Sequence, residues 1–291
     1  TGRGTYDENG IYWCALSGSG FECHYKGSDL NIRIVGDKAS EIPDNDANWA
    51  RYALYVDGKL VIDGQLDSIT KTLTIEGDID ADIKFIKLSE CAMSTLGIYP
   101  IICMGLITPI PQKKLKLEII GDSITCGYGV DVNDPTIPFK TATEDFTKAY
   151  SYKTAKLLDA DVRAFSISGW GIISGYTEDD TAHTGQLIPP YYTKLGFSYQ
   201  KFDDRDGLAP QDISWDFSKY VPWIICIEAV VSGTEAAIQN NWEYILLEHG
   251  YDFVWDDGQN RYYVQKSRLE ILEQAKLLPQ FDELYDVTSR S

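Results

Sequence analysis

The stretch "LEIIGDSITCGYG", residues 117–129, places a serine directly after an apolar run. Residues 115–120 predict a strand, and Gly121 and Asp122 separate that strand from Ser123. A serine hydroxyl can attack a carbonyl carbon when a base takes its proton and nearby N–H groups hold the oxyanion. The same tripeptide is also typical of a simple turn or a helix cap. Ser123 is therefore a candidate nucleophile whose role depends on its surroundings.

A second glycine loop follows the next expected strand. The run at 162–168 predicts a strand, and Gly169 comes directly after it in "SISGWG". Ligands of open α/β sheets bind beyond the carboxyl ends of the strands, so we expect Ser123 and Gly169 at one edge. Glycine lets the backbone approach a reacting oxygen closely. Trp170 and the "PPYY" segment at 189–192 could stack on a ligand there, and the alternative for them is core packing.

A nucleophilic serine needs a base, and the chain contains 3 histidines. His24 lies in "FECHYKG", where a strand residue is expected. His183 lies in the loop after the second glycine motif, where Asp179 and Asp180 could orient it. His249 ends a predicted helix, whose dipole favours the imidazolium form. That environment is poor for a base that must start neutral, so none of the three stands out.

Composition and charge exclude several kinds of partner. The net charge is −18, which disfavours nucleic acid and anionic membranes, because phosphate binding relies on clustered Lys and Arg. A neutral ligand suits such a chain, although acidity can also serve solubility alone. No run of 18 apolar residues predicts a membrane span. The chain opens at "TGRGTYDENG" without a charged-then-apolar leader, so either it is not exported or the leader lies outside this sequence.

The 6 cysteines form no C-x-x-C pair, which disfavours a zinc ribbon or a redox motif. Cys14 and Cys23 could bridge neighbouring strands. Buried free thiols are the alternative, since cysteine is among the most buried residue types.

Residues 1–110 predict a β-sandwich. Leu30, Ile32 and Ile34 alternate with Asn31, Arg33 and Val35, and similar runs follow at 52–64, 71–79 and 83–90. Asp57-Gly58 between two β-rich runs predicts a hairpin turn. Many short strands without a strong helix are typical of a sandwich. The two prolines of 107–114 predict a linker.

Residues 111–291 predict an α/β domain. A strand at 115–120, a helix at 141–160 and strands at 162–168 and 223–227 are typical of a parallel sheet with crossovers. Thr141 with Glu144 resembles a capping box. After residue 228 the pattern becomes atypical, with a helix at 234–250, a hairpin at 253–264 around Asp257-Gly258, and a helix at 267–278 that Ser267 and Glu270 would cap.

At these residues the chain resembles a known family. "IIGDSITCGYGV" (119–130) and "SISGWGI" (166–172) look like the first two motif blocks of SGNH/GDSL hydrolases. Segments 15–37, 51–64 and 86–98 resemble the N-terminal sandwich of carbohydrate esterase family 2. The resemblance covers roughly residues 10–227.

The resemblance implies a jelly-roll domain followed by an SGNH domain, secreted or at the cell surface. It implies serine esterase activity that removes acetyl groups from xylan-like polysaccharide, with no metal or organic cofactor. Ser123 would be the nucleophile, and the backbone N–H groups of Ser123 and Gly169 would be oxyanion donors.

The last quarter departs from the family pattern. A Gly-x-Asn-Asp block should follow residues 223–227, and Gly233-Thr234-Glu235-Ala236 stands nearby without either asparagine or aspartate. The Asp-x-x-His that supplies the base should lie near the C-terminus. We interpret the chain as having no such block anywhere, and no histidine follows His249. A truncated or rearranged C-terminal segment, a relocated base, and a retired enzyme that still binds glycans all fit this pattern.

Two functions from different classes therefore remain: a deacetylating serine esterase and a carbohydrate-binding protein without turnover. A third possibility is that residues 228–291 form a separate domain, but about 60 residues with one hairpin and two helices make a small core.

Overall fold

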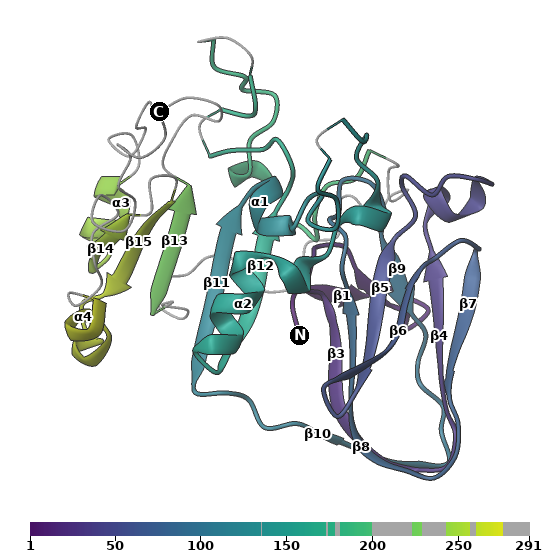
Figure 1. Cartoon of the computed structure of the whole chain (residues 1–291). Helices are drawn as coiled ribbons and strands as arrows, with labels where there is room; N and C mark the ends of the chain where they lie inside the picture. Colours follow the sequence, from purple (N-terminus) through teal and green to yellow (C-terminus); the bar gives the residue numbers. More distant parts are fainter. Residues whose placement is uncertain are drawn as a thin grey trace.

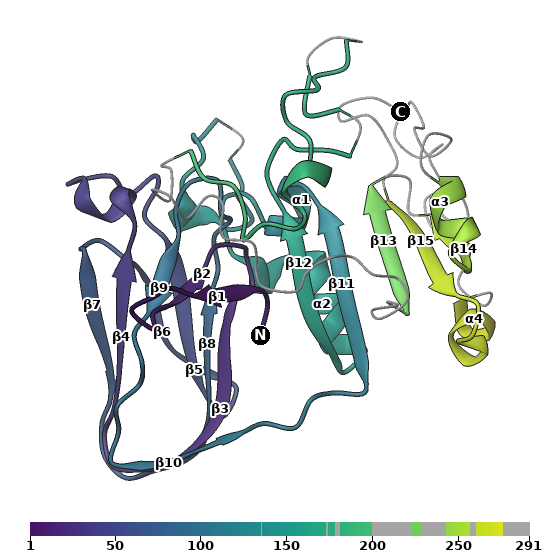
Figure 2. The same cartoon turned by 180° about the vertical axis from the view of Figure 1, so that it is seen from behind.

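The fold comes from a computed structural model that describes residues 1–134, 136–172, 174–177, 181–199, 223–228, 243–256 and 260–275. Its described residues form three five-stranded sheets (Figure 1). The first two sheets lie on one side of the molecule and the third on the other, and the view from behind shows the same arrangement (Figure 2).

The first two sheets are antiparallel throughout and come from residues 4–109. The order in the first is β1 (Gly4–Tyr6), β2 (Tyr12–Cys14), β9 (Leu96–Ile98), β4 (Leu30–Gly36) and β7 (Thr70–Ile75). The order in the second is β10 (Gly105–Pro109), β3 (Gly20–Gly27), β8 (Ile79–Lys87), β5 (Arg51–Val56) and β6 (Lys59–Gln65).

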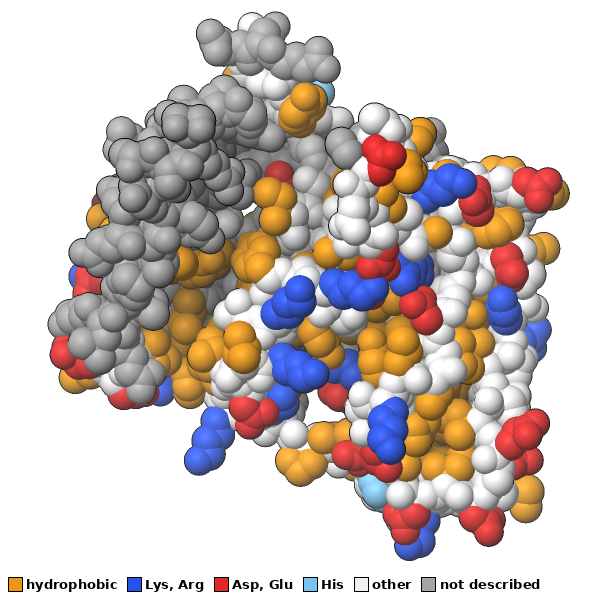
Figure 3. Space-filling view, viewed as in Figure 1, with side chains coloured by type: hydrophobic (Ala, Val, Ile, Leu, Met, Phe, Trp, Pro, Cys, Tyr) orange, Lys and Arg blue, Asp and Glu red, His pale blue; other side chains and the backbone are white. Residues whose placement is uncertain are grey.

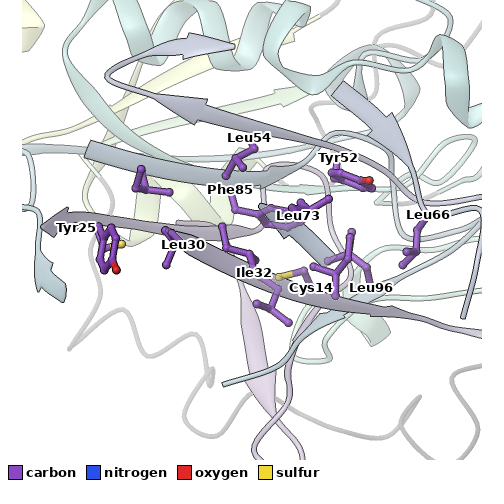
Figure 4. Packing of buried hydrophobic residues seen from close by; sticks show 14 of the residues in the cluster. Cys14, Tyr25, Leu30, Ile32, Tyr52, Leu54, Leu66, Leu73, Phe85 and Leu96 are labelled. Atoms are coloured by element: carbon purple, nitrogen blue, oxygen red, sulfur yellow. The ribbon is translucent and has the colours of Figure 1, made fainter. Parts of the chain in front are cut away.

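These two sheets face each other across one apolar core. Leu30 and Ile32 of β4 pack with Leu54 of β5 and Phe85 of β8, which belong to the opposite sheet (Figure 4). The alternation of apolar and polar residues in β4 therefore predicted its buried face correctly. The predicted hairpin turn is also confirmed: β5 pairs with β6, and Asp57 and Gly58 have φ of 47° and 73°.

The third sheet is mixed and comes from the rest of the chain. Its order is β12 (Ala160–Ser166), β11 (Leu115–Gly121), β13 (Ile224–Glu228), β15 (Asn260–Gln265) and β14 (Tyr251–Asp256). The first three strands are parallel, and the last two add an antiparallel hairpin. The α-helices are α1 (Ser123–Cys126), α2 (Tyr150–Leu157), α3 (Glu243–Glu248) and α4 (Leu269–Ala275). Turns of 3-10 helix occupy Lys38–Glu41, Thr141–Thr143, Phe146–Lys148 and Pro189–Tyr191.

The predicted helix at 141–160 is wrong at its start. Two 3-10 turns precede α2, and Thr141 and Glu144 do not form a capping box. The Thr141 hydroxyl donates to the carbonyl of Trp49 at 2.6 Å, and the buried Glu144 carboxylate accepts the N–H of Glu90 at 3.0 Å. Hydrogen bonds to the segments around the first two sheets therefore prevent the capping box that the spacing of Thr141 and Glu144 predicts.

The predicted linker at 107–114 is also partly wrong. Residues 107–109 belong to β10, where Ile107 and Thr108 pair with β3 and Pro109 lies at the end of an edge strand. An edge strand tolerates proline at such a position, because the ladder bond it lacks would face outward.

The segment after residue 228 contributes strands to the third sheet. The predicted hairpin at 253–264 is confirmed by the pairing of β14 with β15, although Asp257-Gly258 lies outside the described residues. Of the helix predicted at 234–250, α3 is described, and Gly250 follows it with φ of 84°. The helix predicted from Ser267 begins at Leu269 as α4, and Ser267 bonds Gln265 instead of capping it.

All six cysteines are free, and five of them are buried, so no disulfide joins Cys14 to Cys23. None of the helices in the described part of the chain has the length and apolar character needed to cross a bilayer.

A buried arginine connects the second sheet to the later part of the chain. The Arg51 guanidinium, in β5, bonds Asp63 through Nε at 3.0 Å and Nη2 at 2.8 Å, and Asp131 through Nη1 at 2.8 Å. The same Nη1 also donates to the carbonyls of Ala142 and Glu144 at 2.9 and 3.2 Å. One side chain thus fixes the segment between α1 and α2 against β5.

We predict that Arg51→Met lowers the free energy of unfolding by about 3 kcal/mol, because two carboxylates and two carbonyls lose a buried partner. Lys71→Met is the matched control, since Lys71 pairs with Asp67 on the surface at 2.9 Å. That change should cost less than about 1 kcal/mol. Urea unfolding measures both, and equal losses would contradict the role given to Arg51.

Candidate active site

Ser123 lies at a tight turn between β11 and α1. The strand ends at Gly121, the Asp122 carboxylate accepts the N–H of Ile124 at 3.1 Å, and the helix begins with Ser123. The first N–H groups of a helix have no intrahelical acceptor. Ser123 therefore combines a partly exposed hydroxyl with a backbone N–H that is free to bind an oxyanion.

Two glycines allow this turn. A Cβ on Gly121 would lie 2.2 Å from the Thr125 hydroxyl oxygen, and a Cβ on Gly127 would lie 2.5 Å from the carbonyl oxygen of Asp145. Gly127 also has φ of 82°, the left-handed conformation that ends α1. The glycines that flank Ser123 thus have a packing reason as well as a conformational one.

Gly169 lies at the same edge of the sheet as Ser123. Strands β11 and β12 pair in parallel with Gly121 opposite Ser166, and the N–H of Ile167 donates to the carbonyl of Gly121 at 3.3 Å. Gly169 has φ of 77°, and its carbonyl accepts the N–H of Tyr176 at 2.7 Å. Both candidate oxyanion donors therefore follow neighbouring strand ends, as the sequence predicted.

No imidazole among the described residues is hydrogen-bonded to the Ser123 hydroxyl. His24 is a strand residue, as expected, and its two ring nitrogens bond Asp82 at 2.8 Å and Asp80 at 3.0 Å. His249 follows α3, and its Nδ1–H donates to the carbonyl of Ile245 at 2.7 Å. These bonds leave neither of the two histidines in contact with the serine.

His183 is exposed and lies in the loop after Gly169. Its N–H donates to the hydroxyl of Ser174 at 2.9 Å, and its carbonyl accepts the N–H of Gly175. The interpretation that the chain has no Asp-x-x-His is wrong, because Asp180 and His183 have that spacing. Asp179 and Asp180, which were expected to orient His183, lie outside the described residues.

Some aromatic side chains near the Ser123 and Gly169 loops are buried in the core, and others are exposed at the surface. Trp170 is only 4% exposed and packs with Tyr191 and Phe197, so core packing is confirmed for it. Tyr128 is 44% exposed, stacks on Phe139 with ring centroids 3.9 Å apart, and donates its N–H to the carbonyl of Ser123. Tyr128 is therefore an exposed aromatic residue whose backbone contacts Ser123, and the sequence did not single it out.

One buried cluster in the described part of the chain brings possible metal ligands together. Single ligand atoms of Glu90, Cys126 and Glu144 lie within 4.8 Å of one another. Burial raises the pKa of the Cys126 thiol well above its ordinary value, which opposes the thiolate that binds metals. The cluster suits protonated groups better than a cation.

No family model matches this chain. The Cellulase/esterase CelE of Acetivibrio thermocellus is 26% identical over 216 residues, which are 72% of this chain and 24% of that protein. An acetylxylan esterase / glucomannan deacetylase of Cellvibrio japonicus is 31% identical over 187 residues, 59% of this chain and 46% of that protein. The chain thus spans less than half the length of these relatives.

Solved structures share the fold. A family two carbohydrate esterase from Clostridium thermocellum, in complex with cellohexaose, has a TM-score of 0.64 at 22% identity over 85% of this chain and 72% of that chain. An acetyl xylan esterase from Butyrivibrio proteoclasticus has a TM-score of 0.63 at 22% identity over 89% and 65%. The chain is a relative of the family two carbohydrate esterases. That family belongs to the SGNH/GDSL hydrolases, so the resemblance stated from the motif blocks is confirmed.

The family two pattern cannot be followed through the whole chain. Gly233-Thr234-Glu235-Ala236, which stands where the third block is expected, lies outside the described residues. The roles of Ser123 and Gly169 in this relative of the carbohydrate esterases stay predictions.

We predict that Gly127→Ala lowers the free energy of unfolding by about 2 kcal/mol more than Gly129→Ala. Both glycines have positive φ, so each alanine bears a similar backbone strain. Only the Cβ at Gly127 meets a backbone atom, whereas nothing lies within 4 Å of a Cβ at Gly129. Thermal or urea unfolding of the two variants measures the difference, and equal stabilities would contradict the packing argument.

Proposed function

We propose that the chain is a carbohydrate esterase that removes acetyl groups from xylan-like plant polysaccharide through Ser123. One observation supports this most: Ser123 and Gly169 follow the adjacent carboxyl ends of two parallel strands, with Gly121 opposite Ser166. The curated relatives named as esterases match the chain over regions that cover most of it. The proposal needs no metal or organic cofactor, because both oxyanion donors are backbone N–H groups.

The proposed chemistry has two steps. The Ser123 oxygen attacks the acetyl carbonyl carbon, the N–H groups of Ser123 and Gly169 hold the oxyanion, and the C–O bond to the sugar breaks. The serine proton passes to a base and then to the departing sugar hydroxyl. Water attacks the acetyl-serine next, which releases acetate and restores the serine hydroxyl.

Charge and surface fit a neutral polysaccharide. The net charge is −18, and acidic and basic side chains lie side by side on the face shown in Figure 3. Neither nucleic acid nor an anionic membrane is a partner in this proposal. We also propose a secreted or cell-surface protein with a jelly-roll domain up to about residue 110, followed by an SGNH-type domain.

A carbohydrate-binding protein with little turnover is the second candidate. The observation that favours it is the Ser123 hydroxyl, which has no imidazole partner among the described residues. The stacked pair of Tyr128 and Phe139 beside the serine could still hold a sugar ring. The two candidates differ in turnover and share a binding surface.

We predict that the chain releases acetate from acetylated xylan and from 4-nitrophenyl acetate, and that Ser123→Ala lowers kcat at least about a thousandfold. Ser68→Ala, in the turn between β6 and β7, is the control and should keep the wild-type rate. Equal rates for wild type and Ser123→Ala would remove Ser123 as the nucleophile.

We predict that Tyr128→Ala weakens the binding of xylan or cellulose oligosaccharides about tenfold, or about 1.4 kcal/mol, because a sugar ring loses its stacking partner. Isothermal titration on the Ser123→Ala background measures binding without turnover. Tyr6→Ala removes a tyrosine of β1 that is 70% exposed and should leave the affinity unchanged. No heat signal for any oligosaccharide, together with no hydrolysis, would contradict both candidate functions.

A further inference from the structure

A buried pair of carboxyl groups lies at the junction between the first two sheets and the loops of the candidate site. Glu90 follows β8, and Glu144 lies between the 3-10 turns that precede α2. Both side chains are fully buried. The Glu90 N–H donates to Glu144 Oε2 at 3.0 Å, and the N–H of Ser168 donates to Glu90 Oε2 at 2.8 Å. This chain of bonds ends at Ser168, one residue before the proposed oxyanion donor Gly169.

The second oxygen of each carboxyl group has no hydrogen-bond partner within the described parts of the chain. Glu90 Oε1 and Glu144 Oε1 are both buried. Two buried carboxylates side by side repel each other, and an unpaired buried charge is costly. A proton shared by the pair removes one charge and supplies a donor for one of the bare oxygens.

Cations nearby do not neutralise the pair directly. The buried Lys87 ammonium donates to the carbonyl of Glu90 at 2.7 Å and to Ser89, and the Arg51 guanidinium reaches the carbonyl of Glu144. Burial raises the pKa of both carboxyl groups and lowers the pKa of Lys87. The titratable and charged groups that act on the pair from the surrounding segments are Lys87, Arg51, Cys91, Asp122, Cys126 and Tyr128.

We propose that Glu90 is a positioning residue for the Gly169 loop, which it holds through Ser168 with a carboxyl group that shares one proton with Glu144. The importance of the loop for catalysis rests on the proposed function of Gly169. The bond to Ser168 and the shared proton do not, and they are measured without turnover.

The first measurement is backbone amide exchange by mass spectrometry over residues 166–171 in wild type, Glu90→Ala and Glu90→Gln. Alanine removes the acceptor, so exchange at Ser168 should become at least about tenfold faster. Glutamine keeps an acceptor oxygen and should restore protection. If Glu90→Ala exchanges as slowly as wild type, Glu90 does not hold the loop.

The second measurement is kcat and KM with 4-nitrophenyl acetate for the same proteins. Glu90→Ala should lower kcat about tenfold or more, with a smaller change in KM, and Glu90→Gln should recover most of the loss. Faster exchange without any loss of kcat would overturn the positioning role. No turnover in wild type, together with fast exchange in Glu90→Ala, would contradict the esterase proposal and leave the bond to Ser168 standing.

The third measurement is urea unfolding against pH for wild type, Glu144→Gln and the control Glu76→Gln. The folded pair keeps a proton that an unfolded glutamate, with its ordinary pKa of 4.5, releases. The free energy of unfolding therefore falls as the pH rises from 4.5 toward the raised pKa. Glu144→Gln should flatten this fall by removing one titrating group, whereas the exposed Glu76 should not affect it.

An unchanged slope in Glu144→Gln would overturn the shared proton. Elemental analysis of the purified protein gives an independent check. One equivalent of a divalent metal that is lost in Glu144→Gln would show that a cation, not a proton, joins the two carboxyl groups. No metal, together with a flattened slope, supports the proposal.

Discussion

The candidate site depends on polar groups buried between the first two sheets and the third. Arg51, Glu90 and Glu144 belong to segments far apart in the chain, and their bonds bring those segments together. Such groups add little net stability when every partner is present, but the loss of one partner leaves a costly buried charge. The junction therefore specifies one arrangement of the loops more than it strengthens the fold. The bond from Ser168 to Glu90 ties the Gly169 loop to this junction.

Local patterns predicted the strands well but misplaced the start of α2. The alternation in β4 and the turn at Asp57-Gly58 depend on the chain's own backbone preferences and on one buried face, which the sequence displays directly. Thr141 and Glu144 have the spacing of a capping box, yet both side chains bond residues of other segments. The two residues are three positions apart, but their hydrogen-bond partners are far away in the sequence. A spacing pattern within one segment cannot reveal partners in another segment.

The candidate nucleophile could be predicted because a strand end is visible in the sequence. The parallel pairing of β11 with β12 then follows from general rules of α/β sheets, and it places Gly169 near Ser123. Glu90 has no such signal, because its partners lie 54 and 78 residues away. The spacing of Asp180 and His183 is visible in the sequence, and the interpretation that the chain has no Asp-x-x-His overlooked it.

The two proposed oxyanion donors are held in different ways, Ser123 by a tight turn and Gly169 by a loop next to the proposed shared proton. The glycines around Ser123 fix its N–H through packing that hardly depends on pH. The Gly169 loop instead depends on a bond to a carboxyl group in a pair that titrates. An oxyanion hole with one donor of each kind would be fixed on one side and adjustable on the other. Loss of the shared proton would change the charge beside Ser168, whereas the packing around Ser123 would stay the same.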